Sequence, residues 1–209
     1  MNTTEALKLV GGLSKPSKMP GWAYGLPAAE CKTGSKLVDI EGSTCSGCYA
    51  NKGCYVFPVV QAAQYRRLAA IRNPYWVEAM ATLINSKKSK WFRWHDSGDV
   101  QDPEHLLKIF EVCKQTPETR HWLPTREAQI LKHITPADVP SNLIIRMSSH
   151  MINQGPVKSW PWASTVIDRD QPWFGATSKM CPAQEQGNEC KSCRQCWDRD
   201  ISNISYHKH

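Results

Sequence analysis

Two groups of cysteine residues are the part of this sequence best suited to carry chemistry. The first group consists of Cys31, Cys45, Cys48 and Cys54, and the second of Cys181, Cys190, Cys193 and Cys196. Closely spaced thiolates are typical metal ligands, and the run Cys-x-x-Cys-x-x-Cys in the second group has the spacing of iron–sulfur ligands. Tetrahedral zinc sites use the same ligand at similar spacings, and free redox thiols are a further alternative. The spacing favours iron–sulfur clusters and leaves zinc open.

The number of metal centres depends on how the two groups combine. Each group supplies four cysteines by itself, which predicts two centres, each of them a [4Fe-4S] cluster in the favoured interpretation. The alternative is one shared cluster bound by Cys31, Cys45, Cys48 and one cysteine of the second group. The ninth cysteine, Cys113, lies on the apolar stripe of a predicted helix, and we expect it in the hydrophobic core.

The bulk properties of the chain favour metal binding over disulfides. The N-terminus, Met1 to Glu5, lacks the basic and apolar regions of a secretory signal, and no run of about eighteen apolar residues predicts a membrane span. We therefore expect a cytoplasmic protein, in which cysteines stay reduced. The formal charge of +7 is modest and spread along the chain, so nucleic acid is not expected as a partner. The one dense basic run, Lys87–Lys90, is interpreted as a solvated loop.

The elements that must position these residues follow a βαβ pattern. Strand-like runs cover 90–95, 120–124, 143–147 and 165–167. Helical patterns lie mostly between them: two within 58–85, one opened by Asp102-Pro103, and one that contains Ile130, Leu131 and Ile134. This alternation predicts an α/β protein with a parallel sheet. Four or five βα units fit in 209 residues, whereas a complete eight-unit barrel needs roughly 250, so we expect a truncated TIM-like barrel.

The chain is expected to form a single domain, 1–209, with three segments. Residues 1–57 form an irregular N-terminal arm that carries the first cysteine group and a short strand over Lys36–Ile40. Residues 58–178 form the βα core, and residues 179–209 form a cysteine-rich C-terminal tail. Metal bonds would tie the arm and the tail to the core.

Polar residues follow successive predicted strands. In parallel βα folds the carboxyl ends of the strands meet at one edge, where functional groups gather. Each residue also has a structural alternative, such as a helix N-cap for an aspartate or a core position for His95. Their repetition predicts one shared polar cavity lined by candidate catalytic residues, namely His95, Asp96, Asp99, Arg126, Arg146 and His150.

Four sequence motifs together carry a family resemblance. They are Cys45-x-x-Cys48-Tyr-Ala after Cys31, the run His95-Asp-Ser-Gly-Asp99, the run Pro124-Thr-Arg126, and Cys190-x-x-Cys193-x-x-Cys196-Trp197. Over about 15–197, the chain resembles a family of phage proteins called gene product 88. It is similar, more distantly, to phage proteins that look like radical S-adenosylmethionine (SAM) enzymes. The resemblance implies a truncated radical-SAM-like barrel with one or two [4Fe-4S] clusters, working in the host bacterial cytoplasm.

The radical-SAM resemblance also implies a role for three cysteines. Cys31, Cys45 and Cys48 would match the ligands that leave one iron open for SAM. The sequence departs from that pattern, because it lacks the compact Cys-x3-Cys-x2-Cys loop and offers Cys54 as a fourth ligand. It also has no Gly-Gly-Glu run after the first βα unit, where His95–Asp99 stands instead.

Three hypotheses follow, and whether the protein is an enzyme stays open. The favoured one is an iron–sulfur protein with a redox or electron-transfer role and an unidentified redox partner. The second is a radical-SAM-type enzyme that acts on a small-molecule substrate through an open iron. The third is a zinc-stabilised binding module.

Overall fold

The structure is a computed structural model, in which residues 1–171 and 178–208 are described. The described residues form a seven-stranded sheet in which every neighbouring pair is parallel. The strand order, β1-β2-β3-β4-β5-β7-β6, follows the chain except for the last two strands. The strands are β1 (Trp22–Tyr24), β2 (Trp91–Trp94), β3 (Arg120–Thr125), β4 (Leu143–Ser148), β5 (Ala163–Ile167), β6 (Ser178–Met180) and β7 (Asn203–His207).

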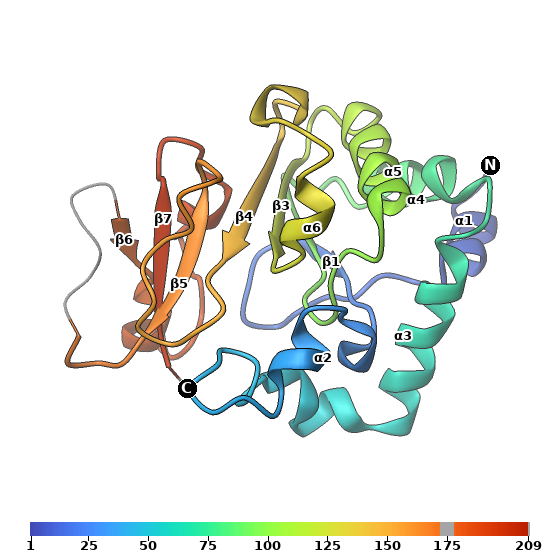
Figure 1. Ribbon diagram of the computed structural model, residues 1–209. Coiled ribbons are helices and arrows are strands. Elements are labelled where there is room, and N and C mark those ends of the chain that lie inside the picture. Colours follow the sequence, from blue (N-terminus) through green and yellow to red (C-terminus); the bar gives the residue numbers. More distant parts are fainter. Residues whose placement is uncertain (172–177, 209) are drawn as a thin grey trace.

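The helices lie mainly beside the β1 half of the sheet (Figure 1). The α-helices are α1 (Thr3–Val10), α2 (Gly34–Leu37), α3 (Pro58–Ala70), α4 (Trp76–Ser86), α5 (Pro103–Lys114) and α6 (Ala128–Leu131). Short 3-10 helices are η1 (Ala28–Glu30), η2 (Tyr49–Asn51), η3 (Gly53–Val56), η4 (Pro136–Asp138), η5 (Pro182–Gln186) and η6 (Gln195–Trp197). No helix in the described ranges is long and apolar enough to cross a membrane.

The predicted α/β class and parallel sheet are confirmed. All four predicted strands are present, as are the two helices within 58–85. Helix α5 begins where the Asp102-Pro103 motif predicts, because the Asp102 carboxylate accepts a hydrogen bond of 2.8 Å from the His105 N–H. The predicted helix near Ile130 is shorter than expected and ends at Leu131.

The N-terminal arm is more regular than predicted. Asn2 and Glu5 form a capping box that starts α1, and Gly11 ends this helix in the left-handed conformation. The predicted strand over Lys36–Ile40 is wrong, because α2 extends to Leu37 and a turn follows it. The sheet has three strands more than the four that were predicted, namely β1, β6 and β7. The additional strands β1 and β6 have three residues each, too few to show alternation, and β7 lies in the segment assigned to the tail.

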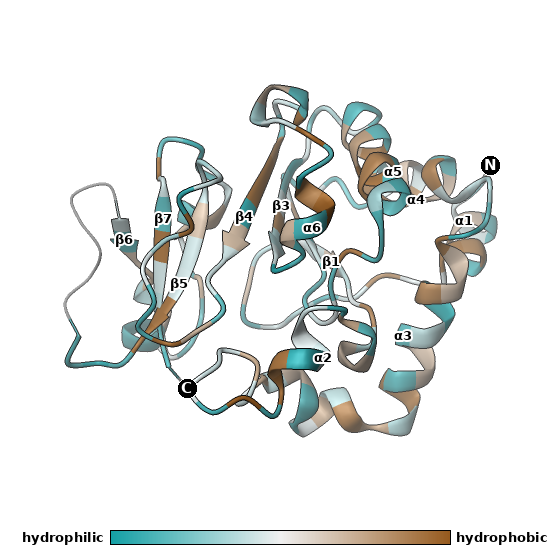
Figure 2. Cartoon of the chain, in the orientation of Figure 1, coloured by the Kyte–Doolittle hydropathy of each residue, from teal (hydrophilic) through white to brown (hydrophobic). Residues whose placement is uncertain are grey.

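The sheet separates two hydrophobic clusters. Alternate residues such as Phe92, Trp94 and Leu123 pack with helical side chains such as Trp76 in the larger cluster. The residues between them, such as Trp122 and Ile144, point to the other face, because successive strand side chains alternate. There they pack against Cys196 and Trp197 of the C-terminal segment. Figure 2 shows hydrophobic colour along β4 and on α6, whereas β6 at the sheet edge is hydrophilic.

Candidate functional site

Three cysteines of the first group lie together in the connection between β1 and α3. Cys45 is buried, and Cys31 and Cys48 are half-buried. A Cβ atom at Gly34 would lie 3.6 Å from the Cys45 sulfur and 3.7 Å from the Cys31 sulfur, so both sulfurs border the same glycine. Burial raises the pKa of Cys31, and Asp99, Cys48 and Cys45 raise it further. The structure therefore brings three thiols of the first group together.

Cys54 stands outside this set. Its side chain is exposed on η3, whereas Cys45 is buried and Cys31 and Cys48 are half-buried. We therefore define the N-terminal set as Cys31, Cys45 and Cys48. The sequence spacing alone could not separate Cys54 from its neighbours.

The N-terminal set lies at the carboxyl end of the central strands. The Glu127 carboxylate, after β3, accepts hydrogen bonds from the N–H of Thr33 at 2.8 Å and from its hydroxyl at 2.7 Å. The Thr44 hydroxyl donates to the backbone carbonyl of His150, after β4, at 3.1 Å. The Arg126 Nε donates to the Thr44 oxygen at 2.9 Å. These bonds fasten the loop below the arrowheads of β3 and β4 in Figure 1.

Asp99 and Arg126 come together at this edge as predicted. The Asp99 carboxylate accepts from the Thr125 hydroxyl at 2.7 Å and from the Arg126 N–H at 2.9 Å. Burial raises the pKa of Asp99 to about 6, although these hydrogen bonds lower it in part. Asp99 is thus a buried carboxyl group beside the N-terminal set.

His95 and Asp96 occupy different environments. The His95 ring faces the Tyr24 carbonyl at 3.0 Å and lies 5.2 Å from the His105 ring, within the larger hydrophobic cluster region. Burial lowers the pKa of His95 to about 4, as expected for a core histidine. The Asp96 carboxyl is also buried, which raises its pKa, while Arg93 and Arg67 lower it in part.

The C-terminal set consists of all four cysteines of the second group. Burial raises the pKa of Cys190, and Cys181 and Cys193 raise it further. Burial raises the pKa of Cys196 to about 12, and Cys181 and Cys190 also raise it. Its sulfur lies 3.2 Å from the Tyr206 hydroxyl. Sequence reasoning missed Tyr206, although the alternation in Asn203–His207 is a strand signal that would have placed it.

Arg146 holds the C-terminal segment against the sheet. Its fully buried side chain donates to the backbone carbonyls of Cys196, Ile201, Gln195 and Asp198 at 3.1, 3.0, 3.1 and 2.7 Å. The structure therefore places Arg146 against this segment, apart from the strand-end residues with which it was grouped. His150 lies at the carboxyl edge of the sheet, where its backbone carbonyl accepts the hydrogen bond from the Thr44 hydroxyl.

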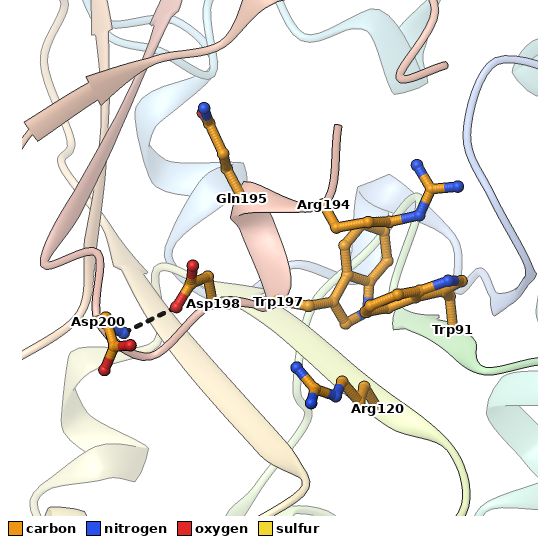
Figure 3. A pocket seen from close by; sticks show the side chains of 7 residues that line it. All are labelled: Trp91, Arg120, Arg194, Gln195, Trp197, Asp198 and Asp200. Atoms are coloured by element: carbon orange, nitrogen blue, oxygen red, sulfur yellow. Dashed lines mark hydrogen bonds between the residues drawn. The ribbon is translucent and has the colours of Figure 1, made fainter. Parts of the chain in front are cut away.

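A cavity of about 410 Å³ lies beside the C-terminal set (Figure 3). Trp91 and Arg120, which begin β2 and β3, line it, so it opens at the amino end of these strands. The Trp91 and Trp197 rings meet edge to face at 5.4 Å, and Arg194 lies 5.5 Å from the Trp91 ring centre. The remaining lining residues are Gln195, Asp198 and Asp200.

The described residues offer no ready site for a single metal ion. Within the described ranges, no group of three His, Cys, Asp or Glu side chains is arranged to hold a metal ion. The thiolates of an iron–sulfur cluster bind different irons, so they need not converge on one point as the ligands of a single ion do. Each set draws its thiols from one part of the chain.

Comparisons with known proteins identify the family. The family model described as gene product 88 matches residues 2–199, which include both cysteine sets. Comparisons with curated proteins and with solved structures gave no match. The chain therefore belongs to the gene product 88 family, the phage family that its motifs resemble.

Proposed function

We propose that this chain is an iron–sulfur protein with a redox role, and that each cysteine set holds one [4Fe-4S] cluster. The supporting observation is the gathering of seven cysteines into two sets, Cys31, Cys45 and Cys48 on one side and Cys181, Cys190, Cys193 and Cys196 on the other. Such clusters take up and release single electrons, which suits electron transfer.

A metal bound by these cysteines would have to displace the protons of buried thiols. Burial raises the pKa of Cys31, Cys45 and Cys196, so these thiols are neutral at physiological pH in the absence of metal. A metal centre supplies the positive charge that removes the proton from a coordinating thiol. Trp197 and Trp122 pack against Cys196 and would limit the access of water to a cluster there.

We also propose that the sheet is a truncated, radical-SAM-like barrel. Its strands are parallel and follow one another in chain order from β1 to β5, as in barrel folds. The N-terminal set follows the first strand and lies at the carboxyl edge, where barrel enzymes carry their active sites.

A second candidate function is a radical-SAM-type enzyme. The observation that favours it is the position of Cys54 outside the N-terminal set, because three thiolates leave one iron of a cubane without a cysteine ligand. SAM would occupy that iron, and Asp99 and Arg126 would face the same edge of the sheet.

The first experiment is anaerobic purification followed by iron, zinc and acid-labile sulfide assays and an absorption spectrum. Two cubanes predict a brown protein with about eight irons and eight sulfides per chain. Cys193→Ala should lose about half of both, whereas Cys113→Ala, which changes a core cysteine of α5, should lose none. A colourless protein with zinc and no sulfide would overturn the proposal in favour of the zinc module.

The second experiment separates the electron carrier from the enzyme. SAM added to the dithionite-reduced protein should change the electron paramagnetic resonance (EPR) signal of the N-terminal cluster if one iron is open. The Cys54→Ala variant should then retain its iron. An unchanged signal, together with iron loss in Cys54→Ala, would identify a cluster closed by four cysteines and exclude the enzyme.

A further inference from the structure

The two cysteine sets lie in environments of opposite electrostatic character. Beside the C-terminal set, the Tyr206 hydroxyl lies 3.2 Å from the Cys196 sulfur. Arg146 donates to the Cys196 carbonyl at 3.1 Å, and Arg194 donates to the Cys193 carbonyl at 2.6 Å. A hydroxyl donor and two guanidinium groups therefore surround this set.

The chemistry of the sulfur fixes the direction of the Tyr206 hydrogen bond in the metal-bound state. A thiolate that binds iron has no proton, so the hydroxyl is the donor and the sulfur the acceptor.

The N-terminal set is flanked mainly by carboxylates. Two hydrogen bonds from Thr33 hold the buried Glu127 carboxylate, and Thr33 is two residues from Cys31. The buried Asp99 carboxylate lies at the same edge and, with Glu127, adds to the raised pKa of Cys31. Arg126 is the cation that opposes them, through its effect on the pKa of Cys45.

Reduction adds one electron, and thus one negative charge, to a cluster without making or breaking a bond. Hydrogen bonds to the sulfurs and nearby cations stabilise that added charge, whereas nearby carboxylates oppose it. We infer that the C-terminal set holds the cluster of higher reduction potential. Tyr206 contributes to this difference in potential as a positioning residue. A single electron from a one-electron donor is therefore held by the C-terminal cluster. This inference rests on the proposed function.

The test is an anaerobic redox titration of the full chain, with dithionite as the one-electron reductant and EPR as the readout. Two steps are expected. Tyr206→Phe should shift the higher step to lower potential and leave the lower step unchanged. The matched control Tyr75→Phe, which removes a hydroxyl from a 61% exposed side chain, should change neither step.

Two more variants make the assignment independent of Tyr206. Cys48→Ala, which removes a ligand of the N-terminal cluster, should leave a single step at the higher potential. Glu127→Gln, which removes a charge near Cys31, should shift the lower step to higher potential.

The outcomes distinguish this inference from the proposed function. A protein without iron and sulfide overturns the proposed function and the inference with it. Full iron content with an unchanged higher step in Tyr206→Phe, or a lone lower step in Cys48→Ala, overturns the inference alone. If Tyr206→Phe loses iron, the ranking is decided by Cys48→Ala and Glu127→Gln.

Discussion

Three buried histidines lie along the helix-covered face of the sheet. His95, His105 and His121 are each at most 2% exposed. One ring nitrogen of each, Nε2 in His95 and His105 and Nδ1 in His121, has no hydrogen-bond partner among the described residues. Burial lowers the pKa of His95 to about 4 and that of His121 to about 3. These rings are therefore kept neutral by the folded protein.

The neutral histidines predict a loss of stability in acid. Their pKa values in the folded protein lie below the value of 6.5 in the unfolded chain. Their contribution to the free energy of unfolding is therefore complete above pH 6.5 and falls as the pH drops toward 4. At pH 5 we expect each of His95 and His121 to reduce the free energy of unfolding by about 2 kcal/mol. Asp99 acts in the opposite direction, because its folded pKa of about 6 lies above its unfolded value.

Denaturant unfolding of the chelated, metal-free protein at pH 7.5, 6 and 5 measures this effect. His121→Gln should make the free energy of unfolding less dependent on pH. The same change at the exposed His133 should leave the pH dependence as it is in the original protein. Stability that is constant between pH 7.5 and 5 would contradict the prediction.

Arg146 shows how one side chain stabilises a whole segment. Its guanidinium donates to carbonyls of the C-terminal segment, including those of Cys196, Asp198 and Ile201. Arg146→Met leaves these buried acceptors without their donor, and we expect a loss of about 3–5 kcal/mol in the free energy of unfolding. The control Arg120→Met, at an exposed position, should cost less than about 1 kcal/mol in the same urea titration. Equal losses would refute the role given to Arg146.

At the scale of elements, the loops after β1 and β2 are locked together. The Leu26 N–H donates to the Ser97 carbonyl at 2.8 Å, and the Ser97 hydroxyl donates to the Leu26 carbonyl at 2.7 Å. Gly98 has φ of 75°, and a Cβ there would lie 2.6 Å from the Leu26 Cβ and 2.8 Å from its backbone. Backbone cannot move aside as the end of a side chain can, so only glycine fits.

Gly98→Ala should therefore destabilise the protein by more than about 2 kcal/mol in denaturant unfolding. Gly187 provides the control, because it has a φ of 74° and no atom of the described residues lies within 4 Å of the position that an added methyl group would take. Gly187→Ala should cost only the left-handed backbone penalty of about 1 kcal/mol. Similar costs for the two substitutions would show that the contact with Leu26 relaxes.

The elements that sequence could predict are those with strong local signals. Helix α5 has a cap, a proline and an apolar stripe, and β4 begins with the apolar run Leu143-Ile-Ile. Local patterns could not show that Val59 would be 73% exposed, because exposure depends on which side of a helix other elements cover. Nor could they show which face of β4 the C-terminal segment would cover, and so Arg146 was grouped with the strand-end residues.

At the scale of the whole molecule, the two cysteine sets should differ in their dependence on metal. The C-terminal segment has metal-independent contacts, such as Arg146 to its carbonyls and the Trp197 indole to the Phe92 carbonyl at 3.0 Å. The 31–57 loop has metal-independent bonds from Thr33 and Thr44 as well, but its residues 51–57 are mostly exposed. Cluster removal should therefore lower the melting temperature and increase hydrogen exchange more in the 31–57 loop than in 195–207.

Hydrogen exchange with mass spectrometry on the metal-bound and chelated protein provides the measurement. Peptides from α4 and α5 serve as the internal reference, because both helices lie in the larger hydrophobic cluster. Unchanged melting and unchanged exchange in the 31–57 loop would contradict a stabilising role of the metal.

The order of β5, β7 and β6 has a consequence for synthesis on the ribosome. Strand β7 pairs with both β5 and β6, so neither can complete its hydrogen bonds until residues 203–207 have emerged. An open strand edge is a template for pairing with other chains. During translation the β5 edge therefore stays uncovered until residues 203–207 are available, and β7 then closes it.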